Sequence, residues 1–496
     1  YRTKKIVTQK LCGRLHATVD GTSSKEAETI SFENLHEVLR KAYFEEGETD
    51  GVLKLAPSII GMGKDFTGAD IIQAALEASN NNKGQASGII NALIASCFSR
   101  IRRQDKSSDG DEDGSVELFA AMAWDIYTSW EELADELGSF NPDIVTLCCT
   151  YSALDAASES SGINREDADY FRDCAGKVLD TAQRRTKKIT GSKRRKLLVS
   201  ISRRHGKNTK NGSDYLDSLK ASYGEDFDVL FEDDNVIVVN KPAGMVCFHS
   251  RKTTDGRIGR KKKQKGGKKK KKGKQNSNVE EGKNDAFQND ISLEDALVDV
   301  GVSLSTLNKD ALGIVHRIDR GTSGCIILAK NDHTHAQLVT SFFLREVKKT
   351  YNALVPHRSS DDLEHELEEA GDITVEVGGR PALSSFRVDR SFGTSALLLN
   401  IDTSTGRKHQ VRIHCAKGLG RPIFLDPLYS SDNQNGKKEN VITQDENLTK
   451  AIDKVADSDG RRFFLHASSI QADDFNVDVT ASLPNWWSNV LDAIEE

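Results

Sequence analysis

The spacing of apolar positions divides the chain into two parts. Before residue 190, apolar residues recur at helical spacing in four segments, which we expect to form paired antiparallel helices: 86–100, 115–129, 143–157 and 166–182. Beyond residue 220, the pattern changes to short apolar runs, which we expect to be central strands: VIVVN at 236–240, CIILA at 325–329, LLLNI at 397–401 and VRIH at 411–414. The pattern therefore predicts a helical region followed by a domain that contains a sheet.

One loop between two strand-like runs carries a candidate catalytic group. Residues 313–331 read GIVHRIDRGTSGCIILAKN, and the loop holds Asp319 between Arg317 and Arg320. Two glycines mark a turn, which would place Asp319 at the end of a strand, facing a cleft. A surface ion-pair cluster would explain the same residues, and such clusters outnumber catalytic ones.

Residues 221–490 resemble the RluA-type pseudouridine synthase family, which isomerises uridine in RNA. The resemblance rests on five segments in the family's order: VLFEDDNVIVVNKPAGM at 229–245, HRIDRGTSG at 316–324, KKTYNALV at 348–355, TSTGRKHQVRIHCAKGLGRPI at 403–423 and FLHASSI at 464–470. It implies an α+β catalytic domain with a mixed, mainly antiparallel sheet.

The resemblance also implies a set of site residues. It makes Asp319 the catalytic carboxylate and places Tyr351 in the pocket, where the ring stacks on a flipped base and the phenol accepts a proton from C5. It assigns the arginine that holds the carboxylate to Arg412, with Arg407 as the alternative. The residues that it implies for substrate binding are Arg317, Arg320, His316, Arg407, His409 and Lys241. The alternative is that these residues have only structural roles. Arg412 and Arg407 would then lie on a solvated face of a strand, and Tyr351 would be an ordinary half-buried strand residue.

The absence of several sequence motifs narrows the class of reaction. Moving the ribose from N1 to C5 of uracil needs no redox change. The sequence has no dinucleotide-binding or P-loop fingerprint and no Cys/His cluster at metal-binding spacing. We therefore expect no cofactor and no metal. We expect His316 and His409 to be hydrogen-bond donors that order their loops. A hydrolase elbow is absent, and Asp402 and Asp426 have no catalytic task in the family pattern.

Charge is distributed unevenly along the chain. The net charge of −6 conceals basic stretches at 187–210 and 251–274, the second of which contains KKKQKGGKKKKKGK. We expect residues 251–285 to be a disordered lysine-rich insertion in the catalytic domain. It would serve as a tether for RNA phosphates or a nuclear-import signal, or only as a solubilising insertion. Polar segments at 359–371 and 430–461 are expected to be surface loops.

The sequence pattern in the first half of the chain predicts a helical domain, unlike the sheet-containing domain of the second half. Residues 1–85 are expected to be helical or partly disordered, residues 86–185 to form helical hairpins, and residues 186–220 to form a basic linker to the catalytic domain at 221–490. The phrase NPDIVTLCCTYSALDAA, preceded by a Leu-Phe-x-x-Met segment, is similar to pentatricopeptide repeats, which read single-stranded RNA. A helical domain of another kind, which packs on the synthase or binds protein, is the alternative.

These patterns together predict an RNA pseudouridine synthase that acts through Asp319. The competing hypothesis is an inactive helical-repeat RNA-binding protein that uses the synthase domain as a clamp. The expected partner is RNA, whether ribosomal, transfer or messenger, and we expect a monomer that does not interact with membranes. The eight scattered cysteines suit a reducing compartment. Because the chain starts at Tyr1, we expect a fragment or processed product, and the compartment stays open between an organelle (mitochondrion or plastid) and the nucleus.

Overall fold

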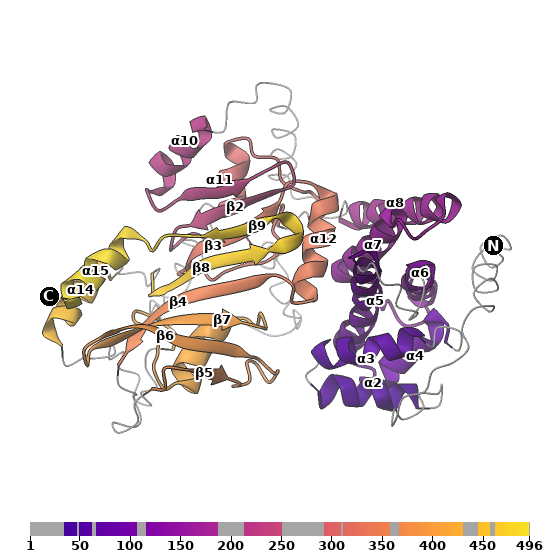
Figure 1. Ribbon diagram of the computed structural model, residues 1–496, viewed down its shortest axis with the longest axis horizontal. Coiled ribbons are helices and arrows are strands. Elements are labelled where there is room, and N and C mark those ends of the chain that lie inside the picture. The colour runs from indigo at the N-terminus through magenta and orange to yellow at the C-terminus, as the bar shows by residue number, and fades with distance from the viewer. Residues whose placement is uncertain are drawn as a thin grey trace, which may run out of the picture.

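The chain folds into a helical domain and a sheet domain that lie side by side (Figure 1). The computed structural model describes residues 34–46, 49–61, 66–106, 116–186, 213–249, 292–308, 311–357, 367–429, 445–456 and 462–495. The helical domain comprises residues 35–186 and the sheet domain residues 213–495. The expected lysine-rich insertion at 251–285 and most of the expected basic linker lie outside the described residues.

The helical domain is built from helices with clear start signals. Its described helices are α2 (Leu35–Phe44), α3 (Thr49–Gly61), α4 (Gly68–Ala78), α5 (Lys83–Lys106), α6 (Val116–Leu133), α7 (Ile144–Glu159) and α8 (Arg165–Thr186). Thr67 and Asp70 form a reciprocal capping box at the start of α4, and Asp143 and Thr146 form another at α7. The four helices expected from apolar spacing are confirmed as α5 to α8.

These helices pack in two rows, with alternate helices in contact. Helix α3 packs on α5 and α5 on α7, while α2 packs on α4 and α4 on α6. Most helices that are direct neighbours in the chain also contact each other, with α3 and α4 as the exception. The two rows share a continuous core in which Trp130 and Phe171 are fully buried.

The strands of the described residues form one nine-stranded sheet. They are β1 (Asp228–Glu232), β2 (Val236–Lys241), β3 (Ser323–Ala329), β4 (Lys348–Pro356), β5 (Ala370–Ile373), β6 (Ser384–Phe392), β7 (Ala396–Thr403), β8 (Leu465–Ala472) and β9 (Val477–Thr480). The order is β1-β2-β3-β8-β4-β7-β6-β5, with β9 paired to the second half of β8. The β3–β8 pair is parallel and every other pair is antiparallel, so the expected mixed, mainly antiparallel sheet is confirmed.

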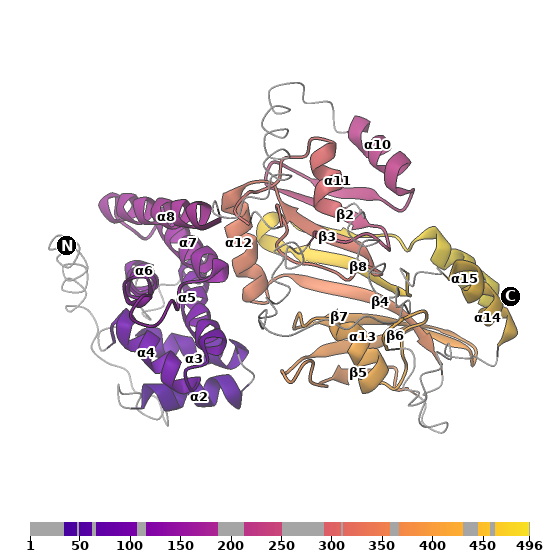
Figure 2. The ribbon, with the colours of Figure 1, turned by 180° about the vertical axis from the view of Figure 1, so that it is seen from behind.

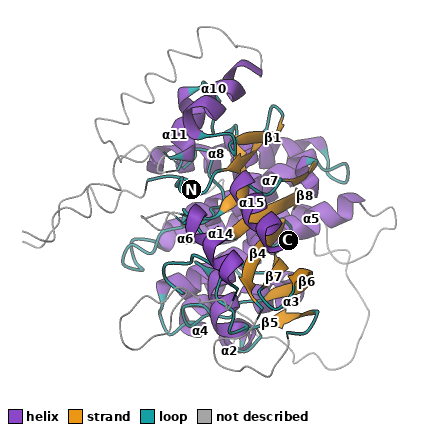
Figure 3. Ribbon diagram, turned by 90° about the vertical axis from the view of Figure 1, so that its left-hand side faces the viewer, coloured by secondary structure: helices purple, strands orange, loops and turns teal. Residues whose placement is uncertain are grey.

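Helices cover both faces of this sheet. The described helices of the domain are α10 (Ser213–Tyr223), α11 (Leu293–Asp299), α12 (Asp332–Phe343), α13 (Gln410–Ile413), the π-helical turn η2 (His414–Gly418), α14 (Glu446–Val455), the 3-10 turn η3 (Asp473–Phe475) and α15 (Asn485–Glu495). Along β2, Ile237 and Val239 face the core under α11, whereas Val236 and Val238 face the core under α12. Figure 2 shows α11 and α13 on the same face, and Figure 3 shows α14 and α15 together at the end remote from the helical domain.

Three sequence expectations about local structure were wrong. Residues 411–414, expected as a strand, lie in α13 and η2, because a four-residue apolar alternation is too short to separate strand from helix. The run at 313–316 forms only an isolated bridge between Ile314 and Leu328. Of the expected surface loops, 359–371 runs into the start of β5, and the described part of 430–461 contains α14, whose Leu448 is fully buried.

Helix α12 joins the two domains. Ala336 on α12 and Leu307 are buried in the core of the helical domain, although both belong to the sheet domain by sequence. The helix packs on α7, where the Ser152 and Thr340 hydroxyls lie 3.0 Å apart, and also on β3. Figure 1 shows α12 between the sheet and α7. The helical domain is therefore fixed to the sheet domain by a shared core.

Two further features of the described residues concern the chain's surroundings. Their seven cysteines are all buried free thiols. None of their helices has both the length and the apolar character that a membrane crossing requires.

Candidate active site

A cavity of about 430 Å³ opens between the Asp319 loop and residues 403–412. Its lining includes seven of the nine residues singled out from the sequence: His316, Arg317, Asp319, Tyr351, Arg407, His409 and Arg412. The other two, Lys241 and Arg320, do not line it. The volume falls in the range of small-molecule and nucleotide sites.

The centre of the site is an ion pair between Asp319 and Arg412. Arg412 Nη1 donates to Asp319 Oδ2 at 3.0 Å, and the side chains are 5% and 20% exposed, respectively. Asp319 is therefore held by a buried cation while one side remains open to the cavity. Arg407, the alternative partner, instead donates from Nε to the carbonyl of Pro381. The geometry selects Arg412.

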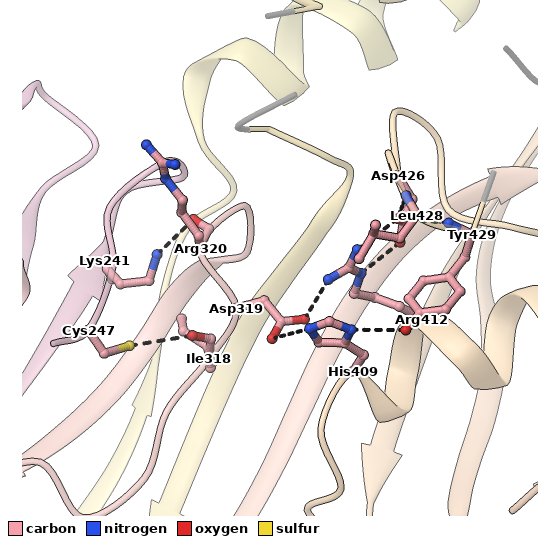
Figure 4. Close-up of polar contacts among 10 residues, drawn as sticks. All are labelled: Lys241, Cys247, Ile318, Asp319, Arg320, His409, Arg412, Asp426, Leu428 and Tyr429. Carbon is pink, nitrogen blue, oxygen red and sulfur yellow. Dashed lines mark hydrogen bonds and ion pairs between the residues drawn. The ribbon is translucent and has the colours of Figure 1, made fainter. Parts of the chain in front are cut away.

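Arg412 is itself held by a second carboxylate that sequence reasoning dismissed. Its Nε and Nη2 donate to the two oxygens of Asp426 at 2.7 and 2.8 Å, and Asp426 is fully buried. Asp426 also accepts from the backbone N–H groups of Leu428 and Tyr429 (Figure 4). The signal was present in the sequence IFLDPLY, because a carboxylate within an apolar run requires a cation when it is buried.

The charge balance keeps Arg412 protonated. Burial alone would lower the pKa of its guanidinium, but the hydrogen bonds and charges of Asp426 and Asp319 outweigh that effect and raise the pKa. The guanidinium also lies over the rings of Phe463 and Tyr429, 4.5 and 5.1 Å from their centroids. Arg412 is thus a fixed positive charge behind Asp319.

His409 contacts the other oxygen of Asp319. Its Nε2 lies 3.6 Å from Asp319 Oδ1, and its Nδ1 lies 2.9 Å from the Tyr429 hydroxyl. Burial lowers the pKa of His409, and Arg412 lowers it further, while Asp319 raises it. The backbone of His409 has a φ of 60°, which marks the sharp turn into α13. The histidine therefore connects the loop to both Asp319 and Tyr429, rather than only ordering its own loop as expected.

Glycines let the Asp319 loop approach the neighbouring strand. A Cβ at Gly321 would lie 2.2 Å from the Phe463 ring, and Gly324, with a φ of 112°, would place one 2.2 Å from the carbonyl oxygen of Ala467. Any other residue would push the loop away from the strand that begins at Leu465. The two glycines thus set the depth of Asp319 in the cavity.

Lys241 and Arg320 support the loop from behind. The Lys241 ammonium is fully buried and donates to the carbonyls of Pro242, Met245 and Arg320, at 3.0, 2.8 and 3.3 Å. Arg320 Nε donates to the carbonyl of Gly244. Burial lowers the pKa of Lys241 to about 8. Expected as substrate-binding residues, both instead tie the turn after β2 to the Asp319 loop.

Tyr351 forms part of the cavity wall. It projects from β4 and packs against two clusters of buried residues, one that includes residues of α13 and one that includes residues of α11. Burial, with the charge of Asp319, raises the pKa of the Tyr351 phenol well above its usual range. The resting side chain is therefore a neutral phenol that presents its ring to the cavity.

The remaining predicted residues lie along the rim and wall. Arg317 extends over the ring of Phe248, 5.4 Å from its centroid. His316 stacks on Phe342 with ring centroids 4.6 Å apart, and its Nε2 accepts from the backbone N–H of Ile327. It is therefore an acceptor rather than the expected donor, and burial lowers the pKa of its imidazole to about 3.

The described residues contain no cluster of three or more His, Cys, Asp or Glu side chains that could hold a metal. Asp319 faces the cavity as a carboxylate, which can attack a ligand there as a nucleophile or remove a proton from it.

The region that carries this geometry matches a known family model. Residues 235–417 match the RNA pseudouridylate synthase family. The matched residues contain Lys241, the Asp319 loop, Tyr351 and Arg412, but not Asp426. Helices α2 to α8 of the helical domain also lie outside the match.

Individual relatives agree with that match. The chain is 30% identical over 218 residues to RNA pseudouridine synthase 2, chloroplastic, of Oryza sativa subsp. japonica, covering 41% of this chain and 49% of the relative. It is 28% identical over 230 residues to ribosomal large subunit pseudouridine synthase D of Nitrosomonas europaea, covering 44% and 53%. The chain thus spans about half the length of these relatives. The solved structure of human RNA Pseudouridylate Synthase Domain Containing 4 matches with a TM-score of 0.37 and 21% identity, over 57% of this chain and 97% of that one.

Proposed function

We propose that the protein is an RNA pseudouridine synthase, in which Asp319 catalyses the isomerisation of uridine. The observation that carries the proposal is the Asp319–Arg412–Asp426 arrangement at a cavity of nucleotide size, with Asp319 and Arg412 inside the segment that matches the synthase family. The reaction breaks the bond between N1 and C1′ of uridine and forms one between C5 and C1′. N1 gains a proton and C5 loses one, so no oxidant, reductant or energy source is required.

Asp319 supplies the carboxylate that this reaction needs. Held by Arg412 on one oxygen and close to His409 on the other, it keeps a fixed position with an open path to the ligand. It acts on the ribose or on the base, either by attack or by proton removal. Tyr351 packs on the base and takes part in the loss of the C5 proton. These roles are supported by the presence of both residues in the lining of one cavity.

We propose RNA as the substrate, with ribosomal RNA tested first. The name of the Nitrosomonas relative refers to the ribosomal large subunit, which is what favours this class. Because a stacked uridine cannot reach Asp319, the nucleotide has to flip out of the RNA. Arg317, on the rim of the cavity, is proposed to occupy the place that the base leaves.

The helical domain is proposed to guide the RNA to this site as a repeat-like RNA-binding unit. The two rows of alternately packed helices support this proposal. The competing hypothesis, an inactive synthase domain that serves as a clamp, is not favoured. A clamp has no need of a carboxylate held by a buried arginine, nor of a second carboxylate to hold that arginine.

The decisive experiment compares the native chain with Asp319→Ala on unmodified RNA. Transcripts of ribosomal and transfer RNA would be incubated with each protein, and new pseudouridines mapped by carbodiimide-stop sequencing. We expect sites only with the native chain, while Asp389→Ala, an exposed acidic residue on β6, keeps the activity. Asp319→Ala leaves the Arg412–Asp426 pair in place, so it should fold. Equal modification by Asp319→Ala and the native chain would overturn the proposal.

A further inference from the structure

The cavity lining is strongly basic, and the part of it that contains Arg345 and Lys349 is called the basic end below. Of the residues that line the cavity, Asp319 is the only one with a carboxylate. Six carry basic side chains, namely Arg317, Arg345, Lys349, Arg407, Lys408 and Arg412. Arg412 is matched by Asp319 and Asp426, but the proposed reaction assigns no task to Arg345 or Lys349. An excess of cations in a cavity favours an anionic ligand.

Lys349 projects into this basic end from β4. It lies two residues before Tyr351, so both side chains leave the strand on the cavity side, whereas Lys348 is exposed and does not line the cavity. Its ammonium lies 5.8 Å from the centroid of the Phe342 ring and close to Gly406. Among the described residues, it has no carboxylate within ion-pair distance.

The electrostatic surroundings of Lys349 also call for an anion. Burial, together with the smaller effect of the Arg345 charge, lowers the pKa of Lys349 to about 8. Asp50 lies 3.7 Å from Arg345 Nε, but no carboxylate of the described residues lies within ion-pair distance of Lys349, so the charge of Arg345 repels the Lys349 ammonium. A phosphate would relieve this repulsion.

Thr403 provides an independent observation on the adjacent strand. Thr350 pairs with Asp402 in the β4–β7 ladder, and continuing this register places Thr403 opposite Lys349. The Thr403 hydroxyl is buried and has no hydrogen-bond partner among the described residues, and Thr403 lines the cavity. A buried hydroxyl without a partner is costly and usually marks the place of a ligand or water.

Arg345 completes the basic end from the turn after α12. Its φ of 64° is unusual for an arginine, and such local strain concentrates at functional sites. The turn is fixed by the helical domain, where Arg102 pairs with Glu346 at 3.1 Å. Asp50, in the first turn of α3, lies 3.7 Å from Arg345 Nε. The helical domain therefore contributes to the position of a cavity residue.

We propose that Arg345, Lys349 and Thr403 form a binding site for a backbone phosphate of the RNA, next to the nucleotide that enters at Asp319. This inference rests on the proposed function for its choice of RNA. A phosphodiester offers several acceptor oxygens to a guanidinium, an ammonium and a hydroxyl. Such a contact would fix the register of the RNA without reading its bases.

The test measures binding of a single-stranded oligouridylate as a function of salt concentration, because this readout needs no catalysis. For Lys349→Met, we expect binding about 10-fold weaker at physiological salt and a plot of log affinity against log salt that is shallower by about 0.7. Lys348→Met is the matched control, since it removes the same charge from the opposite side of the same strand. Arg345→Gly is the second variant, because glycine accepts the positive φ and should fold without strain.

Each outcome separates this inference from the proposed function. A shallower slope for Lys349→Met and Arg345→Gly, but not for Lys348→Met, supports the phosphate site, whether or not the protein forms pseudouridine. Equal slopes for Lys349→Met and Lys348→Met would overturn it, even if the native chain modifies RNA. If Lys349→Met does not fold, the same comparison between Arg345→Gly and Lys348→Met decides the question.

Discussion

At the scale of single residues, the site depends on buried charges that hold one another. Asp426 fixes Arg412, and Arg412 fixes Asp319, so the proposed catalytic carboxylate is only the last member of a chain of three. Asp319 is the most exposed of the three, at 20%, against 5% for Arg412 and 0% for Asp426. Removal of an inner member should therefore affect stability as well as chemistry.

Asp426→Asn should lower the free energy of unfolding by about 3 kcal/mol, because it leaves Arg412 buried with half of its compensation removed. Urea unfolding measures this change. Asp402→Asn is the control, since Asp402 is exposed and accepts a hydrogen bond only at the surface, from Thr350; it should stay within about 0.5 kcal/mol. Equal losses in the two variants would contradict the role of Asp426.

Tyr351→Phe separates the ring from the phenol oxygen. The ring keeps its packing between the two cores, so affinity for unmodified RNA should change by less than about 2-fold. If the phenol takes part in removal of the C5 proton, single-turnover pseudouridine formation should slow by about 100-fold or more. A variant as fast as the native chain would limit Tyr351 to packing.

At this scale, the sequence predicted those site residues that lie within a recognisable motif of their own. Asp319, Tyr351 and Arg412 were singled out from separate segments, and the fold brings them to one cavity. Asp426, Lys349 and Thr403 were missed because their importance comes from neighbours that are distant in sequence. Lys241 was chosen for its motif, but full burial under three carbonyls gives it a supporting position.

At the scale of elements, the parallel β3–β8 junction places the Asp319 loop. Ser323 pairs with His466 in the ladder, and their side chains also meet, with Oγ 2.9 Å from Nδ1. His466 Nε2 lies 3.2 Å from the carbonyl of Ala481. A neutral imidazole satisfies both contacts, because it donates to the carbonyl and accepts from the hydroxyl.

Because His466 is neutral at this junction, we expect the free energy of unfolding to decrease in mild acid. Burial lowers the pKa of His466 to about 4, so the folded state binds its proton later than the unfolded chain, whose pKa is about 6.5. Stability from this group is complete above pH 6.5 and is lost as the pH falls from about 6.5 to about 4. At pH 5 the loss should be about 2 kcal/mol.

His466→Gln should give a shallower dependence of the unfolding free energy on pH over that interval, measured by urea unfolding at several pH values. Buried His335, whose pKa burial also lowers to about 4, remains in both proteins and contributes equally. Parallel curves for the native chain and the variant would show that His466 does not titrate on unfolding.

Element assignment from the sequence succeeded where the pattern was long. Helices α5 to α8 and strands β2, β3 and β7 follow apolar periodicities of five residues or more. The strand prediction for residues 411–414 was wrong because contacts with residues outside the segment set their backbone conformation. The side-chain amide of Gln410 binds Leu383 and Ser384, and the positive φ of His409 turns the chain into α13.

At the scale of the whole molecule, the helical domain reaches the rim of the cavity. Asp50 on α3 and a phosphate would compete for the same guanidinium of Arg345. Asp50→Asn should therefore tighten oligouridylate binding by about 2- to 5-fold, the range that an exposed ion pair allows. Filter binding at low salt measures this effect. Asp135→Asn, an exposed control on the same domain, changes the net charge equally and should have little effect.

The shared core at α12 also sets the order in which the protein can be completed during synthesis. Helix α7 ends at Glu159, yet α12, which covers part of it, ends only at Phe343. At ordinary elongation rates, roughly 180 further residues take about 10 to 40 s to be translated. Throughout that interval, the nascent helices present an uncovered apolar surface to the solvent or to a chaperone. The helical domain leaves the ribosome before the sheet domain but is finished only when the middle of the sheet domain arrives.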